Sequence, residues 1–297
     1  MDVLSISLFG NLTLHCASEE PQRTHTLPPR SAALLGILAL GAGRSIGRSE
    51  LIQMLWESDD RGGSAACLNT ALWRLRKGLL ACSPNAGKMI AGDAREGLSL
   101  RLDSTVCVDV LEFQKYVLPT LSRPVDVLSA DDIDALAKGV RLYRADLLAN
   151  VSDHWAQRER ERLRRCFLDA LAHLMRYAAL QGAFDEAIRR GQRMLELDPL
   201  REDIHRQLMG YFLQNGQRAH ALRQFEYCRH LLKTELAIAP MPETMALYRG
   251  IAQQALHAQS EPQTTLLSVH ENDAREPLHQ ARQLLAETER KLHLLLG

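Results

Sequence analysis

Cationic and polar side chains gather on one side of a predicted helix in the stretch SAACLNTALWRLRKGLL, residues 64–80. At ~100° per residue, the apolar stripe of this helix consists of Leu68, Leu72, Leu75 and Leu79. The opposite side consists of Ala66, Thr70, Trp73, Arg74 and Lys77, and the stripe is flanked by Asn69 and Arg76. No acidic residue occurs from Ser64 to Cys82, although the chain balances 36 basic residues against 36 acidic ones. The outer face therefore has the chemistry to meet an anionic partner.

Two interpretations of this outer face are open. The major groove of DNA admits one helix and offers base edges to Asn, Thr and Arg side chains. A solvated helix face would carry the same cations without any partner. Trp73 favours a partner, because an exposed indole beside cations is costly unless it binds another molecule or packs within the domain.

Catalytic and metal-binding patterns are missing from the sequence. The eleven histidines form no H-E-x-x-H motif or other metal-spaced cluster. The stretch GAGRSIG, residues 41–47, follows a predicted helix and lacks the G-K-[ST] ending of a phosphate loop, so it predicts a turn. No G-x-S-x-G motif, and no serine or cysteine with an evident base, indicates nucleophilic catalysis. We expect no enzyme activity, no catalytic residue, no metal and no cofactor.

Cysteine use and hydropathy predict the compartment. The six cysteines are scattered without a C-x-x-C pair, which is typical of reduced thiols. The longest apolar run, residues 32–42, is too short to span a bilayer, and the first residues lack the pattern of a secretory signal. We expect a cytoplasmic protein without membrane contact.

A second charged segment is HWAQRERERLRRC, residues 154–166. Arg and Glu alternate from Arg158 to Arg162, and Arg164 and Arg165 follow. Opposite charges three or four residues apart pair on a helix, which favours a salt-bridged surface or a seam between domains. A patch that contacts phosphates is the alternative.

The first hundred residues contain the elements that must position the 64–80 helix. LSISLFGNLTLHC alternates like a strand pair with a turn near Gly10, and Thr24 to Pro29 is a short extended piece. Helices are predicted over residues 31–40, over 49–56 with Ser49 as N-cap, and over 64–80. KMIAG and LSLRLD, joined by DAREG, predict a β-hairpin. The order is strands, three helices, hairpin.

From Val110 onward the pattern is almost entirely helical, apart from a loop-like interruption around residues 118–130. Gly182-x4-Ala187 recurs as Gly216-x4-Ala221, at an offset of 34 residues. This offset is the tetratricopeptide period, in which each unit is a pair of antiparallel helices.

The last forty residues begin with a polar stretch and end in a short predicted helix with a heptad seam. The seam consists of Leu278, Ala281, Leu285, Thr288, Leu292 and Leu295. This helix either docks back on the repeats or forms a coiled coil with a second copy.

The motifs in this order resemble a known pair of domains. PPRSAALLGILAL, GRSIGRSELIQMLWESD and the 64–80 helix, followed by the hairpin, resemble the OmpR/PhoB-type winged helix. The continuation from VRLYRADLLANVSDHWAQRERERLRRC, through L-D-P-L-R-E, to the E-L-x-I-x-P-x-P-E-T closing run resembles the bacterial transcriptional activator domain. Together they resemble the SARP-like regulators over roughly residues 1–254.

The resemblance implies a mainly α fold. An N-terminal winged helix-turn-helix domain (α+β) would span residues 1–108, and an all-α TPR-like helical repeat domain would span residues 109–255. Residues 256–297 would be a polar linker and a short amphipathic C-terminal helix.

The resemblance also implies a sequence-specific DNA-binding transcriptional regulator. The helix 64–80 would enter the major groove, and the hairpin 89–102 the adjacent minor groove. Carried over by position, the residues facing bases or nearby phosphates are Asn69, Thr70, Trp73, Arg74 and Lys77. Arg76 and Lys88 would neutralise the DNA backbone. At the hairpin tip, Asp93 and Glu96 would repel phosphate, so that only Arg95 could help.

The partners that we expect follow from this function. They are double-stranded DNA, RNA polymerase at the loop of residues 56–64, and a peptide or small-molecule effector on the repeat domain. We also expect a homodimer, because about five cations near the contact give a single copy weak, salt-sensitive binding. The alternative function is a TPR-type adaptor or signal receptor in which the winged helix mediates protein contacts.

Overall fold

The computed structural model describes residues 4–16, 24–57, 62–82, 86–92, 97–103 and 106–260, and the structural statements below concern these residues. The chain forms two compact units, Met1–Asn215 and Gly216–Gly297. The first unit contains every element from β1 to α8, and the second contains α9 and α10. The predicted C-terminal helix with its heptad seam lies outside the described residues.

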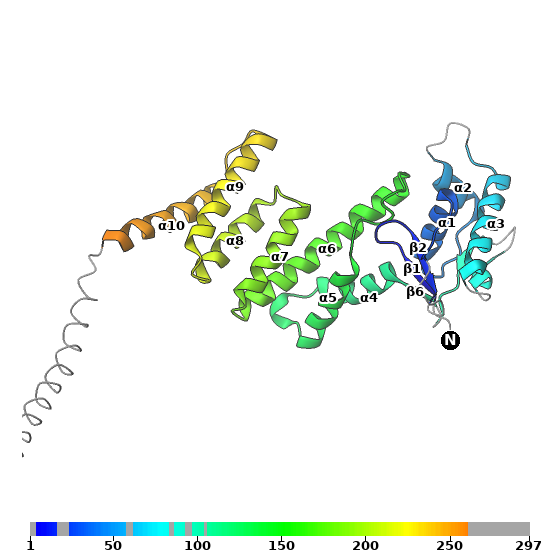
Figure 1. The fold of residues 1–297 in the computed structure, drawn as a ribbon, viewed down its shortest axis with the longest axis horizontal. Coiled ribbons are helices and arrows are strands. Elements are labelled where there is room, and N and C mark those ends of the chain that lie inside the picture. The colour runs from blue at the N-terminus through cyan, green and yellow to red at the C-terminus, as the bar shows by residue number, and fades with distance from the viewer. Residues whose placement is uncertain are drawn as a thin grey trace, which may run out of the picture. The chain divides into compact units, whose positions relative to one another are not determined.

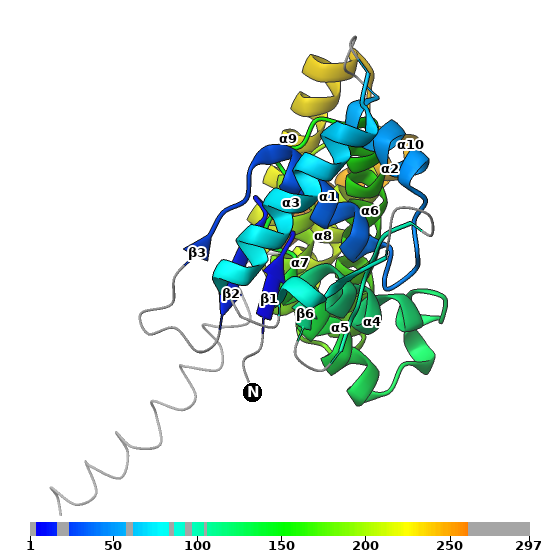
Figure 2. The ribbon, with the colours of Figure 1, turned by 90° about the vertical axis from the view of Figure 1, so that its right-hand side faces the viewer.

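A four-stranded sheet with the order β3-β2-β1-β6 lies in the N-terminal part of the first unit. Its strands are β1 (Leu4–Ser7), β2 (Thr13–Cys16), β3 (Thr24–His25) and β6 (Val106–Val108). Leu4 and Ile6 are buried while the serines between them are half-buried, as expected for a sheet with one covered face. The predicted pairing of β1 with β2 is confirmed. β6 pairs in parallel with β1, beside which it is labelled in Figure 2. This pairing was not predicted, because three residues are too few for a strand pattern.

Three helices and a hairpin follow β3 in the predicted order. They are α1 (Pro29–Leu40), α2 (Arg48–Trp56), α3 (Ala65–Cys82), the short helix η1 (Ala86–Lys88), β4 (Ile90–Ala91) and β5 (Ser99–Leu100). The prediction of Ser49 as an N-cap is wrong: α2 begins at Arg48, and its N-cap is Gly47 without a side-chain cap. A two-way backbone bridge between Ile46 and Leu98 ties the turn before α2 to the hairpin.

The remainder of the first unit is helical (Figure 1). Its elements are α4 (Asp109–Leu121), η2 (Val125–Val127), α5 (Ala130–Leu142), α6 (His154–Leu180), α7 (Phe184–Leu197) and α8 (Glu202–Gln214). The predicted interruption at residue 118 begins later, because α4 continues through Pro119 to Leu121. A capping box between Ser129 and Asp132 starts α5.

The helical repeats are built around small residues. Ala187 is fully buried, and Gly182 takes a φ of 71° in the turn between α6 and α7. A Cβ atom on Gly191 of α7 would lie 2.7 Å from a methyl group of Leu208, so α7 and α8 pack closely at this glycine and a larger residue would require Leu208 to shift. The mainly α fold, with a winged helix followed by TPR-like helices, is confirmed.

The second unit contains α9 (Arg218–Leu236) and α10 (Pro242–Ser260). Phe225 and Tyr248 stack with their ring centroids 4.0 Å apart. Arg218 donates hydrogen bonds to the carbonyl of Ile251, and these contacts join the two helices.

The N-terminal elements contact α4 and α6 at a surface that we call the junction. The Asp109 carboxylate accepts hydrogen bonds from the backbone N–H groups of Leu8 (2.9 Å) and Phe9 (3.1 Å). Burial raises the pKa of Asp109, and these N–H donors oppose that shift. Arg160 of α6 donates to the carbonyls of Leu147, Leu148 and Val151, each at 2.9 Å. These bonds hold α6 to the loop before it, and Arg30 of α1 pairs with Asp153 at the N-cap of α6, so it is at its start that the segment 154–166 contacts the N-terminal elements.

Candidate nucleic-acid interface

The leucine stripe of α3 faces the core and leaves the cationic side outward. Leu68, Leu75 and Leu79 are fully buried, and Leu72 is nearly so. On the other side, Trp73 is 61% exposed, so the indole does not pack against the described part of the hairpin. The Lys77 ammonium lies 5.2 Å from the Trp73 ring centroid, where a cation–π contact holds the two side chains together.

Arg74 and Lys77 make no hydrogen bond or ion pair with any residue that the structure describes, and both are exposed. Their charges are therefore available to a partner. An aromatic ring flanked by two cations offers apolar contact area and charge within one helical turn. This combination suits a polyanion whose grooves present base edges and methyl groups beside its phosphates.

The two polar residues at the start of the predicted face have partners within the protein. The Asn69 amide oxygen accepts a hydrogen bond from the guanidinium of Arg48, and the Thr70 hydroxyl donates to the carbonyl of Ala66 at 2.9 Å. Arg48 was not among the predicted residues. It adds a cation beside α3, and only the crossing of α2 over α3 brings it there.

Arg76 and Lys88 occupy different settings. Arg76 is half-buried and its guanidinium lies 3.5 Å from the carbonyl of Ile90, so it links α3 to the hairpin as well as carrying charge. Lys88 is exposed at the end of η1. Arg95, at the predicted hairpin tip, lies outside the described residues. The structure thus brings Asn69, Thr70, Trp73, Arg74 and Lys77 onto one helix face, with Arg76 at its edge.

A pocket of about 470 Å³ opens beside this face, between the N-terminal turns of α1 and α3. Its lining includes Trp56, Cys67, Thr70 and Arg74. Arg30 lies over the Trp56 ring, 5.8 Å from its centroid, and forms an ion pair with the buried Asp153 at 3.0 Å. The same guanidinium donates to the carbonyl of Leu55, so the end of α2 is fixed to the start of α6.

Comparison with known proteins identifies a domain that this chain shares with bacterial regulators. Residues 108–252 match the bacterial transcriptional activator domain, and the chain is homologous to named transcriptional regulators. These similarities agree with the resemblance to the SARP-like regulators that its motifs indicated. Among the described residues, none of the helices combines the length and the apolar character that crossing a membrane requires.

Three relatives of this chain come from Streptomyces and Mycobacterium. The regulatory protein AfsR of Streptomyces coelicolor is 29% identical over 252 residues, which are 82% of this chain and 24% of AfsR. The transcriptional regulator RedD of the same organism is 29% identical over 70% of this chain and 59% of RedD. The transcriptional regulatory protein MoaR1 of Mycobacterium tuberculosis is 23% identical over 76% of this chain and 73% of MoaR1. The chain thus spans about a quarter of the length of AfsR.

A solved structure shares the fold. Mycobacterium tuberculosis EmbR, in complex with a low-affinity phosphopeptide, matches with a TM-score of 0.67 and 19% identity. The match covers 86% of this chain and 66% of the EmbR chain. At this identity the likeness concerns the fold alone.

Proposed function

We propose that this protein regulates transcription by binding specific DNA sequences through α3 in the major groove. The observation that carries the proposal is the division of α3 into a buried leucine stripe and an exposed face with Trp73, Arg74 and Lys77. The helix has no acidic residue, so the face repels no phosphate. Residues 1–108 would form the DNA-binding domain and residues 109–255 the activator domain.

Each residue of the face has a proposed role. Thr70, Trp73 and Arg74 would contact bases. Lys77, Arg76 and Lys88 would neutralise phosphates, and Arg95 at the predicted hairpin tip could add a further phosphate contact. Asn69 would reach a base only by exchanging its hydrogen bond with Arg48. The three phosphate contacts, or four with Arg95, give a salt dependence in which each doubling of salt lowers affinity about 6- to 12-fold. A single copy then binds weakly, which supports two copies on repeated half-sites.

The other expected partners belong to the same proposal. The loop of residues 56–64 would contact RNA polymerase, because it connects α2 with α3 beside the DNA-facing side. A regulator of this type acts where the genome is, which in a bacterium is the cytoplasm.

Selection from a random duplex library at low salt, followed by gel shifts, tests the proposal. We expect wild-type protein to enrich one motif, and Arg74→Ala and Lys77→Ala each to weaken binding about tenfold. Lys138→Ala is the matched control, because Lys138 is an exposed cation on α5. Enrichment of no sequence, or equal binding by all three variants, would overturn the proposal.

A second candidate function is reception of a peptide or small effector by the helical domain. A pocket of about 600 Å³ is lined by residues of η2, α6 and α8, including Asp126, Arg176 and Tyr211. Arg176 makes no hydrogen bond or ion pair with a described residue, and Leu180 at the same pocket is 66% exposed. The affinity for a peptide or small effector, compared between the Arg176→Ala and Lys138→Ala variants, would show whether this pocket is used.

A further inference from the structure

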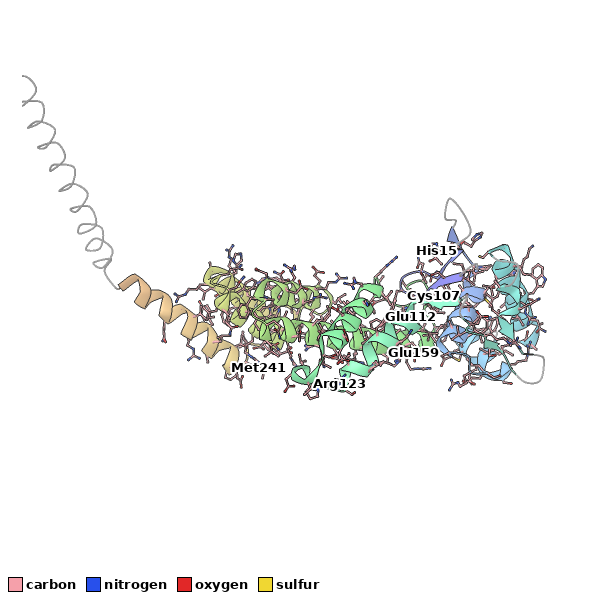
Figure 3. The ribbon with its side chains drawn as sticks, turned by 90° about the horizontal axis from the view of Figure 1, so that it is seen from below. His15, Cys107, Glu112, Arg123, Glu159 and Met241 are labelled. Carbon is pink, nitrogen blue, oxygen red and sulfur yellow. The ribbon has the colours of Figure 1, made fainter. Side chains whose placement is uncertain are left out.

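A cavity of about 260 Å³ lies at the junction, where α6 meets α1, α2 and the turn between them. Its apolar wall includes Ile37, Ile46, Met54 and Trp155. Glu159, labelled in Figure 3, lies on the α6 side of this cavity. The cavity volume corresponds to about nine water molecules at ~30 Å³ each. A small organic acid has a volume of the same order.

The charged rim of the cavity is unevenly paired. Glu159 and Arg162 form an ion pair at 2.8 Å, so their charges compensate each other. Arg44 from the turn and Arg158 from α6 also line the cavity, and neither guanidinium group makes a hydrogen bond or ion pair with a described residue. Glu50 is the opposing charge on the rim. The rim therefore keeps one net positive charge, with two free guanidinium groups from different elements.

The turn that carries Arg44 is held in place by the fold. Ala42 and Gly43 take φ values of 48° and 84°, and the N–H of Arg44 donates to the carbonyl of Gly41 at 3.0 Å. Ile46 exchanges backbone hydrogen bonds with Leu98 at 2.9 Å. The turn is therefore held against the hairpin, which fixes the backbone that carries Arg44 within the winged-helix part.

The opposite wall is equally fixed. Trp155 is 3% exposed, in the first turn of α6, and Arg160 one turn and a half later binds three carbonyls. A cavity with a mixed polar and apolar lining and two unpaired cations from different elements on its rim has the features of a small-ligand site between domains. Guanidinium groups suit a carboxylate, which accepts two hydrogen bonds in their fixed geometry.

We propose that this cavity binds a small apolar carboxylate and thereby regulates the protein. The acid group would lie between Arg44 and Arg158, and the hydrocarbon would lie against Ile37, Met54 and Trp155. One wall belongs to the α1–α2 part of the winged helix and the other to α6, so an occupant contacts both. Occupancy then changes DNA affinity by favouring one arrangement of the two parts. The regulatory consequence rests on the proposed DNA binding, whereas the binding of the acid does not.

Tryptophan fluorescence of the full chain tests the binding directly. The protein has three tryptophans, and Trp56→Phe with Trp73→Phe leaves only Trp155, in the cavity wall. We expect octanoate and 3-phenylpropanoate to change its emission saturably. Octanol and octylammonium, which lack the negative charge, should do so at least about tenfold more weakly.

Variants of the rim supply the charge test. Arg44→Met with Arg158→Met should weaken octanoate binding about tenfold or more, and Glu50→Gln should strengthen it. Arg165→Met is the matched control, because Arg165 is exposed on α6 and does not line the cavity. The three rim residues are exposed, so these variants should keep the wild-type melting temperature, which is measured alongside.

Three results would overturn the proposal. They are no saturable response to either acid, an equal response to octanol, and unchanged affinity in the Arg44 and Arg158 double variant. The regulatory part is tested with wild-type protein and its selected duplex, and an affinity that octanoate leaves unchanged would overturn it. If no duplex is selected, the DNA-binding proposal fails while the fluorescence result still stands.

Discussion

Helices α3 and α6 both carry clustered cations, yet they use them in opposite ways. Along α6, Arg160 binds three carbonyls, Arg162 pairs with Glu159, and Arg164 donates to the carbonyl of Leu197. On α3, Arg74 and Lys77 are exposed without a hydrogen bond or ion pair to a described residue. Cations alone therefore do not distinguish a helix that ties the fold together from one whose charges stay available to a partner, because that depends on whether acceptors surround the helix in the fold.

The two tryptophans on these helices should give the largest contrast. Trp155→Ala removes a fully packed indole and should lower the free energy of unfolding by about 4 kcal/mol. Trp73→Ala removes an exposed ring and should change it by less than ~0.5 kcal/mol. Urea titrations followed by circular dichroism measure both. A large loss of unfolding free energy in Trp73→Ala would mean that the outer face of α3 contributes to the fold, as α6 does.

Arg160 should show the next largest effect. Arg160→Met leaves the carbonyls of Leu147, Leu148 and Val151 without their charged donor, which should cost about 3 kcal/mol in unfolding free energy. Arg74→Met should cost less than ~0.5 kcal/mol, because no acceptor in the described chain loses a partner. Equal stability of the two variants would show that the junction does not depend on this arginine.

Gly36 of α1 tests how closely the residues of the junction are packed. A Cβ atom there would lie 2.7 Å from a methyl group of Leu148, which is itself fully buried at a φ of 45°. We expect Gly36→Ala to destabilise the protein by about 1–2 kcal/mol. Gly210→Ala, on a helix with open space around it, should instead stabilise by about 0.5–1 kcal/mol. Thermal melting of the two variants gives the sign directly.

The smallest effect concerns pH and lies outside both helices. Burial lowers the pKa of His205, whose ring nitrogen lies 2.9 Å from the carbonyl of Pro199. A histidine with a lowered folded pKa contributes its full stability above the unfolded value of 6.5, and that contribution falls as pH drops below it. His205→Gln should therefore flatten the loss of stability between pH 7 and pH 5. An unchanged slope would assign the pH dependence to other groups.

Periodic patterns predicted the parts of the fold that depend on local sequence. The leucine stripe of α3 and the β1–β2 pair are examples, because burial of one face leaves a regular spacing. Contacts between distant segments leave no such trace. The bond from Arg48 to Asn69 and the contact of Arg76 with Ile90 depend on how α2 and the hairpin cross α3. The predicted start of α2 was wrong because a serine near a helix start resembles an N-cap, even though the helix already begins at Arg48, the residue before Ser49.

The parallel strand β6 also determines where this chain can be divided. Its three residues cover the outer edge of β1 and lead directly into α4, whose first residue, Asp109, holds the N–H groups of Leu8 and Phe9. A fragment that stops after the hairpin, at residue 103, would leave β1 as an uncovered edge with unpaired amides. Such edges recruit strands from other molecules. Fragments ending before Val106 should therefore self-associate, and the shortest well-behaved winged-helix fragment should include the first turn of α4.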